Sequence, residues 1–364
     1  MNYICSKCGN KVSADTKLAK CPCGGLWNLD FTPPAFSLED IDRNEWSMFR
    51  YRKYMALEDN TWRSISLGEG MTPIIPLDDH VLIKMDYCMP TLSYKDRGAA
   101  ALISHCKSIG VTKVVQDSSG NAGNSIAAYA AKAGISCEIF VPEGTSPKKI
   151  DMIRAHGAVC TVVPGSRDHC ADVCRNKVEE EGVYYANHVY NPYFYEGTKT
   201  YIYEVFEQLH RIPEYVLIPV GNGTLFLGAV YALEHLLQSG MIDHLPHILA
   251  VQSQYCDPLL KASKEHLSQP ADVTPKPTLA EGIAIGKPMR GEQILKLAEK
   301  YQVQFISAPE ESIMDARAAL AQKGIYCEHT TAANYAAYLQ YCKDYGPAKD
   351  CLITMCGAGL KSDH

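Results

Sequence analysis

The stretch SYKDRG, residues 93–98, is the most informative part of this chain. It lies between a strand-like run, HVLIKM at residues 80–85, and an alanine-rich, helix-like run. Ser93 is followed three residues later by Asp96, a capping-box spacing that predicts a helix beginning at Ser93. Lys95 then falls in the first turn, where unpaired backbone N–H groups carry partial positive charge and lower the pKa of a lysine. A neutral lysine amine is what Schiff-base chemistry with an aldehyde needs, although a lysine at a helix start is more often a solvated charge.

Three glycine-bearing motifs follow at larger spacing. They are SSGNAG at residues 118–123, PVGNGT at residues 219–224 and MCGAGLK at residues 355–361. The first two each end a strand-like run and open a helix-like run, and the third follows the last strand-like run. Backbone N–H groups at such a helix start can bind a phosphate or a carboxylate. Taken singly, each motif is equally compatible with a tight turn.

Strand-like and helix-like segments alternate along most of the chain. Strands are expected at residues 111–117, 137–141, 159–163, 183–186, 215–220, 247–252, 303–307 and 351–355, and helices at residues 121–133, 148–156, 168–181, 225–237, 312–322 and 332–345. This alternation predicts an α/β fold with parallel sheets and crossover helices. Ligands in such folds bind beyond the carboxyl ends of the strands, so one cleft can hold all the motifs.

Together with TLSYKDRG, residues 91–98, these motifs resemble in content and order those of the fold-type-II pyridoxal-phosphate enzymes, the tryptophan synthase beta-like superfamily. The resemblance covers nearly all of residues 65–364 and is greatest to threonine synthase. It implies two parallel-sheet domains, a large cofactor-binding domain of residues 31–98 and 190–364 and a small substrate-binding domain of residues 99–189. It also implies pyridoxal 5'-phosphate as the cofactor, an amino acid as the substrate and a homodimer.

The resemblance gives each motif a role. Lys95 would carry the cofactor as a Schiff base and, once released, remove the substrate α-proton. Cys356 would lie against the pyridine nitrogen, where a neutral partner favours elimination and replacement over transamination; the alternative is a buried core thiol. Asn121 would bond the cofactor ring hydroxyl. The phosphate would be held by Gly221, Asn222, Gly223 and Thr224, and the substrate by Ser118, Ser119, Gly120, Asn121 and Ala122.

The substrate is where the sequence departs from threonine synthase. Residues 191–199 resemble that family's NPxRxEGxK segment, whose arginine helps bind the phosphate of O-phosphohomoserine, but Phe194 stands at the arginine position. Losing a bidentate arginine contact costs on the order of several kcal/mol in a buried site. Ala122 also replaces a hydroxyl residue, and LAEGIA at residues 279–284 resembles the dehydratases. The expected activity is therefore a threonine-synthase-like lyase reaction, with a serine/threonine ammonia-lyase or β-replacing enzyme as the alternative, and a non-catalytic binding protein as a third.

The first thirty residues form a separate cysteine-rich module. Cys5 and Cys8 are spaced as in a zinc knuckle, and Cys21 and Cys23 form a tighter Cys-Pro-Cys pair. Four thiolates suit tetrahedral zinc, and the metal would supply folding energy that so short a segment lacks. The sequence predicts a structural Zn²⁺ in a zinc-ribbon-like module, with a degenerate, metal-free site as the alternative.

Composition narrows the functional class. A hydrophobic fraction of 46%, a charged fraction of 21% and a net charge of −6 are ordinary for a soluble globular protein and argue against a nucleic-acid surface. No run is long and apolar enough for a membrane, and 15 scattered cysteines without a signal-peptide pattern indicate a cytoplasmic protein with free thiols. Residues 38–57, between Pro33-Pro34 and the first motif, are expected to be a helical connector.

Overall fold

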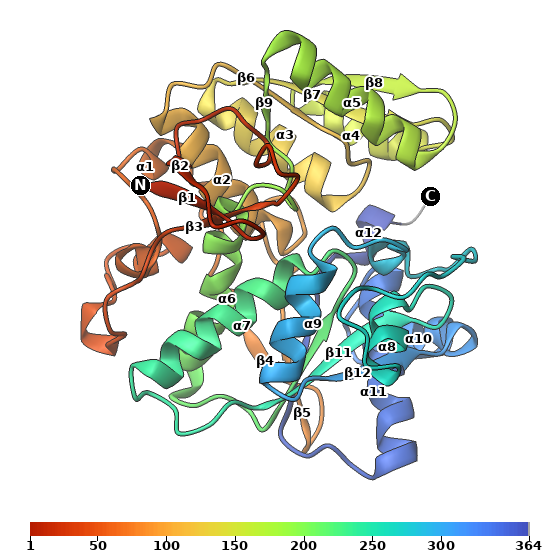
Figure 1. Cartoon of the computed structure of the whole chain (residues 1–364). Helices are drawn as coiled ribbons and strands as arrows, with labels where there is room; N and C mark the ends of the chain where they lie inside the picture. The colour runs from red at the N-terminus through yellow and green to blue at the C-terminus, as the bar shows by residue number, and fades with distance from the viewer. Residues whose placement is uncertain (363–364) are drawn as a thin grey trace.

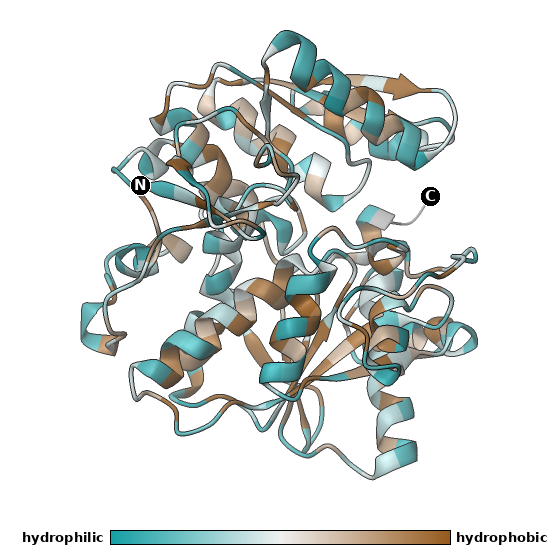
Figure 2. Ribbon diagram, viewed as in Figure 1, coloured by the Kyte–Doolittle hydropathy of each residue, from teal (hydrophilic) through white to brown (hydrophobic). Residues whose placement is uncertain are grey.

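The computed structural model describes residues 1–362 and contains three sheets (Figure 1). In the view of Figure 1 a four-stranded sheet lies in the upper part and a six-stranded sheet in the lower part, with the N-terminal ribbon beside the helices between them. Figure 2 shows that the strands and the inward faces of the helices are apolar, whereas the outer helix faces are polar. The predicted α/β class with parallel sheets is confirmed.

The six-stranded sheet has the strand order β12-β11-β10-β13-β5-β4. All neighbours are parallel except β4, which runs antiparallel to β5. Leu352 of β13 lies level with Val216 of β10 and with Leu82 of β5. The strands are β4 (Ile74–Pro76), β5 (Val81–Lys84), β10 (Tyr215–Pro219), β11 (His247–Ser253), β12 (Gln304–Ala308) and β13 (Cys351–Thr354).

The four-stranded sheet is entirely parallel, with the order β8-β7-β6-β9. Its carboxyl edge therefore collects the loops that lead into its helices, which is where parallel sheets place ligands. The strands are β6 (Lys113–Gln116), β7 (Ser136–Pro142), β8 (Val159–Val163) and β9 (Tyr184–Tyr185). The division of the chain into two domains at the predicted boundaries stays a prediction.

Helices cover both sheets. The α-helices are α1 (Trp62–Ile65), α2 (Lys95–Ser108), α3 (Asn121–Ala133), α4 (Pro147–Ala155), α5 (Arg167–Glu181), α6 (Tyr193–Leu209), α7 (Thr224–Gln238), α8 (Pro258–Lys264), α9 (Gly291–Lys300), α10 (Ile313–Gln322), α11 (His329–Tyr345) and α12 (Gly359–Ser362). Short 3-10 turns are η1 (Leu38–Asp40), η2 (Met48–Tyr54), η3 (Glu281–Ile283) and η4 (Glu310–Ser312). Among residues 1–362, no helix is both long enough and apolar enough to cross a lipid bilayer.

The connector differs from its prediction. Residues 38–57 were expected to be helical throughout, but the structure holds only the 3-10 turns η1 and η2 there. The side chain of Asp42 accepts a hydrogen bond from the backbone N–H of Asn44, and Ser47 Oγ accepts one from the N–H of Phe49. Such local bonds compete with helix formation and explain why the chain turns between the two pieces.

Helices α2 and α6 cross at two glycines. A Cβ on Gly98 would lie 2.2 Å from the ring of Phe194, and a Cβ on Gly197 would lie 1.9 Å from the carbonyl oxygen of Arg97. Only glycine permits this approach, since real Cβ contacts are wider. The crossing fixes the first turn of α2, which begins at Lys95, against the middle of the molecule.

A fully buried charge network supports the same turn. Arg97 donates to both oxygens of Asp86 at 2.8 and 2.9 Å and to both oxygens of Glu204 at 2.9 and 3.1 Å. Lys84 Nζ reaches Glu204 at 2.5 Å. All four side chains have no exposed surface. The charges of two cations and two carboxylates therefore cancel inside the core. Their side chains link β5, α2 and α6.

The N-terminal ribbon, β1 (Asn2–Cys5), β2 (Lys11–Ser13) and β3 (Trp27–Leu29), is antiparallel and packs on the body. Its Trp27 belongs to the same core cluster as α2 and α3. Arg290, only 2% exposed, donates to the carbonyl of Trp27 at 2.7 Å and to those of Val189 and Tyr190 at 2.7 and 3.0 Å. The ribbon is thus bonded to a segment that follows β9.

Candidate active site

Lys95 is the first residue of α2, so the predicted helix start at Ser93 is wrong by two residues. The capping box does not form. Ser93 Oγ accepts a hydrogen bond from the backbone N–H of Lys95 at 3.2 Å, but the carboxylate of Asp96 turns to Thr91, accepting from its N–H at 2.6 Å and its hydroxyl at 2.5 Å, and to the hydroxyl of Ser125. Asp96 therefore ties the loop before α2 to α3 and leaves the lysine free to face the other motifs.

The amine of Lys95 contacts the PVGNGT motif, residues 219–224. Lys95 Nζ donates to Thr224 Oγ1 at 2.8 Å, and the hydroxyl of Tyr94 lies 2.9 Å from the same oxygen. The ring centroid of Tyr94 lies 4.7 Å from Lys95 Nζ. Thr198 on α6 bonds the carbonyl of Thr224 at 2.9 Å. Two motifs whose contacting residues stand 129 positions apart in the chain thus share one contact.

The pKa of Lys95 is lowered from 10.5 to about 8, chiefly because the amine is removed from water. Cys356 and Glu328 raise this pKa and Arg167 lowers it, but burial outweighs all three. The helix start was expected to lower this pKa, but burial is the largest cause. A pKa near 8 leaves roughly a quarter of the amine neutral at pH 7.5, against about 0.1% for an ordinary lysine.

The glycine-rich loop 221–224 presents open backbone donors. It follows β10 with only Val220 between them, and no side chain caps α7, which begins at Thr224. Gly223 has the left-handed φ of +77°, and a Cβ there would lie 2.4 Å from the side chain of Ile294. The first-turn N–H groups of α7 therefore lack a side-chain partner, as an anion-binding helix start requires.

The loop after β13 brings Cys356 to the same place. The backbone N–H of Tyr94 donates to the carbonyl of Cys356 at 3.0 Å, and Ser93 forms a β-bridge with Gly357. The hydroxyl of Thr331 accepts from the N–H groups of both Cys356 and Gly357. Burial raises the pKa of the Cys356 thiol well above its usual value, so the sulfur stays protonated and neutral.

The SSGN loop, residues 118–121, is joined to the site through Glu328, which was not predicted from the sequence. Asn121, the first residue of α3, donates from Nδ2 to Glu328 Oε2 at 2.9 Å, and the N–H of Glu328 donates to the carbonyl of Gly357 at 3.0 Å. Helix α3 has no side-chain cap, so its first N–H groups are also available to an anion. Ser118 and Ala122 are buried beside this turn, and Ser119 and Gly120 are partly exposed.

Lys361 is bonded to the loop before α2. Its Nζ donates to the carbonyl of Thr91 at 2.5 Å, and burial lowers its pKa. Its charge acts on both Asp96 and Glu328. Neither Glu328 nor Lys361 was predicted as a site residue. Lys361 ends the motif MCGAGLK, which marked its position, whereas a lone acid such as Glu328 gives no sequence signal.

Phe194, which stands at the arginine position of the threonine synthase segment, is fully buried. Its ring packs on Gly98 and its centroid lies 5.9 Å from Lys95 Nζ and 5.8 Å from the ring of His188. The ring therefore forms the apolar floor behind the lysine and offers no charge to a substrate.

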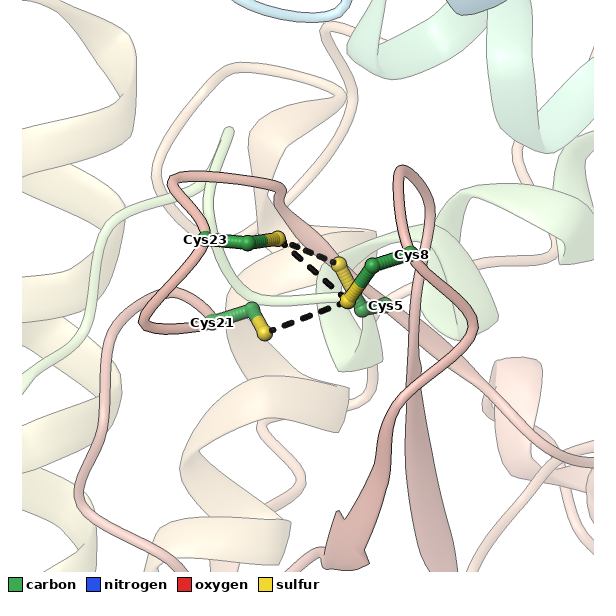
Figure 3. A group of neighbouring side chains, drawn as sticks. All are labelled: Cys5, Cys8, Cys21 and Cys23. Atoms are coloured by element: carbon green, nitrogen blue, oxygen red, sulfur yellow. Dashed lines mark hydrogen bonds between the residues drawn. The ribbon is translucent and has the colours of Figure 1, made fainter.

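The four N-terminal cysteines converge as predicted (Figure 3). Cys5 ends β1 and Cys8 lies in the turn that follows it, whereas Cys21 and Cys23 lie in the loop before β3; the four sulfurs all lie within 4.8 Å of one another. The separations that Figure 3 marks are 3.4 Å for Cys8–Cys23, 3.5 Å for Cys5–Cys23 and 3.7 Å for Cys8–Cys21. Four sulfurs about 2.3 Å from a tetrahedral Zn²⁺ would be about 3.8 Å apart, so the donor set fits this ion.

Comparison with known proteins agrees with this geometry. The sequence profile of "Pyridoxal-phosphate dependent enzyme" matches residues 65–357. The chain is 28% identical to "Threonine synthase" of Methanocaldococcus jannaschii, over 98% of this chain and 92% of that protein, and 31% identical to "Threonine synthase" of Synechocystis sp., over 85% and 82%.

Solved structures show the same fold. Threonine deaminase isoform 2 from Solanum lycopersicum aligns with a TM-score of 0.72 at 19% identity, covering 92% of this chain and 93% of that one. A pyridoxal 5'-phosphate-dependent aspartate racemase aligns with a TM-score of 0.69 at 20% identity, covering 82% and 93%. The predicted fold-type-II architecture is confirmed. The chain therefore belongs to the family of pyridoxal-phosphate dependent enzymes and is a lyase of the threonine-synthase-like type.

Proposed function

We propose that this enzyme converts O-phospho-L-homoserine and water into L-threonine and phosphate. The observation that supports this most directly is the meeting of four separate motifs around one amine. Lys95 Nζ bonds Thr224, the residue before Lys95 bonds Cys356 through its backbone, and Asn121 reaches the same loop through Glu328. Relatives that align with most of this chain carry the name of that activity.

The residues present fit pyridoxal phosphate. The uncapped start of α7, with Gly221, Asn222, Gly223 and Thr224, would hold its phosphate, and Lys95 its aldehyde carbon. The neutral thiol of Cys356 would face the ring nitrogen. Asn121 would turn from Glu328 toward the ring hydroxyl. When bound, the cofactor supplies an electron sink that makes the α-proton of an amino acid acidic.

The protein's own residues would bind the amino-acid substrate and accept its α-proton. The uncapped N–H groups of α3, with Ser118, Ser119, Gly120 and Ala122, would receive the substrate carboxylate and fix its orientation. Lys95, with its lowered pKa, would accept the α-proton at Nζ. Thr224 and Tyr94 would hold the amine in place between proton transfers. Lys361, which is buried, and Glu328, which is half-buried, would help to exclude water from the reacting atoms.

A second candidate is an ammonia-lyase or β-replacing enzyme that acts on serine, threonine or a β-substituted alanine. The observation in its favour is Phe194, a fully buried ring without charge at the position where an arginine would bind phosphohomoserine. Ala122, which offers no hydroxyl, points the same way.

One set of assays separates the two candidates. The purified enzyme, loaded with pyridoxal phosphate, is incubated with O-phospho-L-homoserine, and phosphate and threonine are measured together. Formation of phosphate and threonine in equal amounts supports the threonine synthase reaction. Formation of a keto acid from L-serine or L-threonine, without turnover of the phosphorylated substrate, supports the lyase alternative. No product from any of these substrates would contradict both.

For the N-terminal ribbon we propose a structural Zn²⁺ bound by Cys5, Cys8, Cys21 and Cys23. Burial raises the pKa of Cys5, but hydrogen bonds from the backbone N–H groups of Cys8 and Lys7 outweigh it and bring it to about 6, as suits a thiolate ligand. The homodimer and the cytoplasmic location expected from the sequence stay proposals, which sedimentation velocity and cell fractionation would test.

A further inference from the structure

Tyr94 directs its hydroxyl group at Thr224. Tyr94 Oη lies 2.9 Å from Thr224 Oγ1, and within residues 1–362 this hydroxyl makes no other hydrogen bond. The ring is partly buried and packs against the core cluster that contains Leu225 and Phe226 of α7. Burial raises the pKa of the phenol well above its usual value, so the hydroxyl carries a proton that it can donate.

The hydroxyl of Thr224 has one proton and two lone pairs. Lys95 Nζ donates to Thr224 Oγ1 at 2.8 Å and so occupies one lone pair. A hydrogen bond donated by Tyr94 occupies the second, and the proton of Thr224 is then free to point at a ligand. In the opposite arrangement Thr224 donates to Tyr94 and has no proton left. An anion at the start of α7 therefore favours the arrangement in which Tyr94 donates.

The backbone and the side chain of Thr224 are held from two different helices. Thr198 on α6 donates to the carbonyl oxygen of Thr224 at 2.9 Å, and a Cβ on Gly228 would lie 2.1 Å from Thr198 Oγ1, so α6 and α7 are in close contact there. Tyr94, which precedes α2, holds the hydroxyl. Because no side chain caps α7, this hydroxyl lies among the open N–H groups of its first turn.

We propose that Tyr94 is a positioning residue that orients the hydroxyl of Thr224 toward the phosphate of the bound cofactor. Tyr94 O–H donates to Thr224 Oγ1, and Thr224 O–H donates to a phosphate oxygen. This deepens the proposed function and rests on its placement of the cofactor phosphate at residues 221–224. Hydrogen bonds in such a chain polarise one another, and the negative charge at its end strengthens them. Once the amine of Lys95 is bonded to the cofactor, Tyr94 is the side chain that still holds this hydroxyl.

The test compares the binding of pyridoxal phosphate with that of pyridoxal, which has the same ring and aldehyde but no phosphate. The cofactor is removed from the full-length enzyme, and each compound is titrated back while the visible absorption band is followed. The ratio of the two affinities isolates the phosphate, because an effect on Lys95 is common to both compounds. We expect Y94F to lower this ratio about two- to tenfold and T224V to lower it about tenfold or more.

A matched control and a double variant separate positioning from a merely structural role. Tyr215 begins β10, at the opposite end of that strand from the glycine-rich loop, and packs on His247, so Y215F should leave the ratio unchanged. If Tyr94 acts through Thr224, Y94F/T224V should have the same ratio as T224V alone. T224S keeps the hydroxyl, so Y94F/T224S should lie below T224S by the factor that separates Y94F from the wild type.

The outcomes are distinct. If Y94F weakens pyridoxal phosphate and pyridoxal by the same factor, or weakens neither, the role of Tyr94 is overturned. If Y94F lowers the ratio as much in T224V as in the wild type, the phenol acts without Thr224, and the positioning role is overturned. If T224V leaves the ratio unchanged, the placement of the phosphate fails and the inference fails with it. If the ratios change as expected while O-phospho-L-homoserine is not turned over, the role of Tyr94 stands and the proposed substrate alone fails.

Discussion

The buried network behind Lys95 allows a quantitative prediction for E204Q. Burial raises the pKa of Glu204, but Arg97 and Lys84 outweigh burial and hold it at about 2, below its ordinary 4.5. A carboxyl whose pKa is lower in the folded chain stabilises the fold above the pKa of the unfolded group. The difference corresponds to about 3 kcal/mol at pH 7. Breaking a buried ion pair independently costs about 3–5 kcal/mol, so the two figures agree.

This free energy translates into a melting temperature. With an unfolding entropy of about 2 cal/mol/K per residue over 364 residues, a loss of about 3 kcal/mol lowers Tm by about 4 °C. Circular dichroism at pH 7 measures the shift. The stabilisation fades as pH falls from about 4.5 toward 2, so the difference between wild type and E204Q should be about half as large at pH 3.

The matched control is E299Q, which removes an exposed carboxylate on α9 and should leave Tm within about 1 °C. If E204Q melts together with E299Q at pH 7, the network does not stabilise the fold by the amount derived from its geometry. A difference that grows on acidification would contradict the sign of the linkage.

Three further outcomes follow from the structure. K95A should lose the visible absorption band of the bound cofactor and keep its far-UV circular dichroism; a variant that retains the band would refute the role of Lys95. G98A should be destabilised by about 1–3 kcal/mol, since the new Cβ would lie 2.2 Å from the ring of Phe194, and adding F194A should recover part of the loss. Metal analysis should find close to one zinc per chain, and C5S/C8S should contain none.

Helices and strands with a regular pattern of apolar residues and a clear end signal were predictable from the sequence. Residues 121–133 were expected as a helix and form α3 with those bounds, because the alanine-rich run stops at Gly134, whose φ of +67° ends the helix. Helix α6 was not predicted. Residues 193–206 are buried all round the helix, so no alternation of apolar and polar positions marks its period.

For the site, the motif loops were predictable but their partners were not. Lys95, Thr224, Cys356 and Asn121 come together, as the order of motifs implied. Glu328 lies 207 residues from Asn121 in the chain, and a single acid without a pattern gives no sign of such a contact. Likewise the lowered pKa of Lys95 depends on burial, which becomes known only when the helices are packed.

The position of Arg290 has a consequence for synthesis on the ribosome. Its guanidinium bonds the carbonyl of Trp27, which precedes it by 263 residues. At about 5–20 residues per second, Trp27 is added to the growing chain roughly 13 to 53 seconds before Arg290. During that interval the nascent ribbon lacks its bonds to Arg290, and a metal ion held by its four thiolates would be the earliest means of keeping it folded.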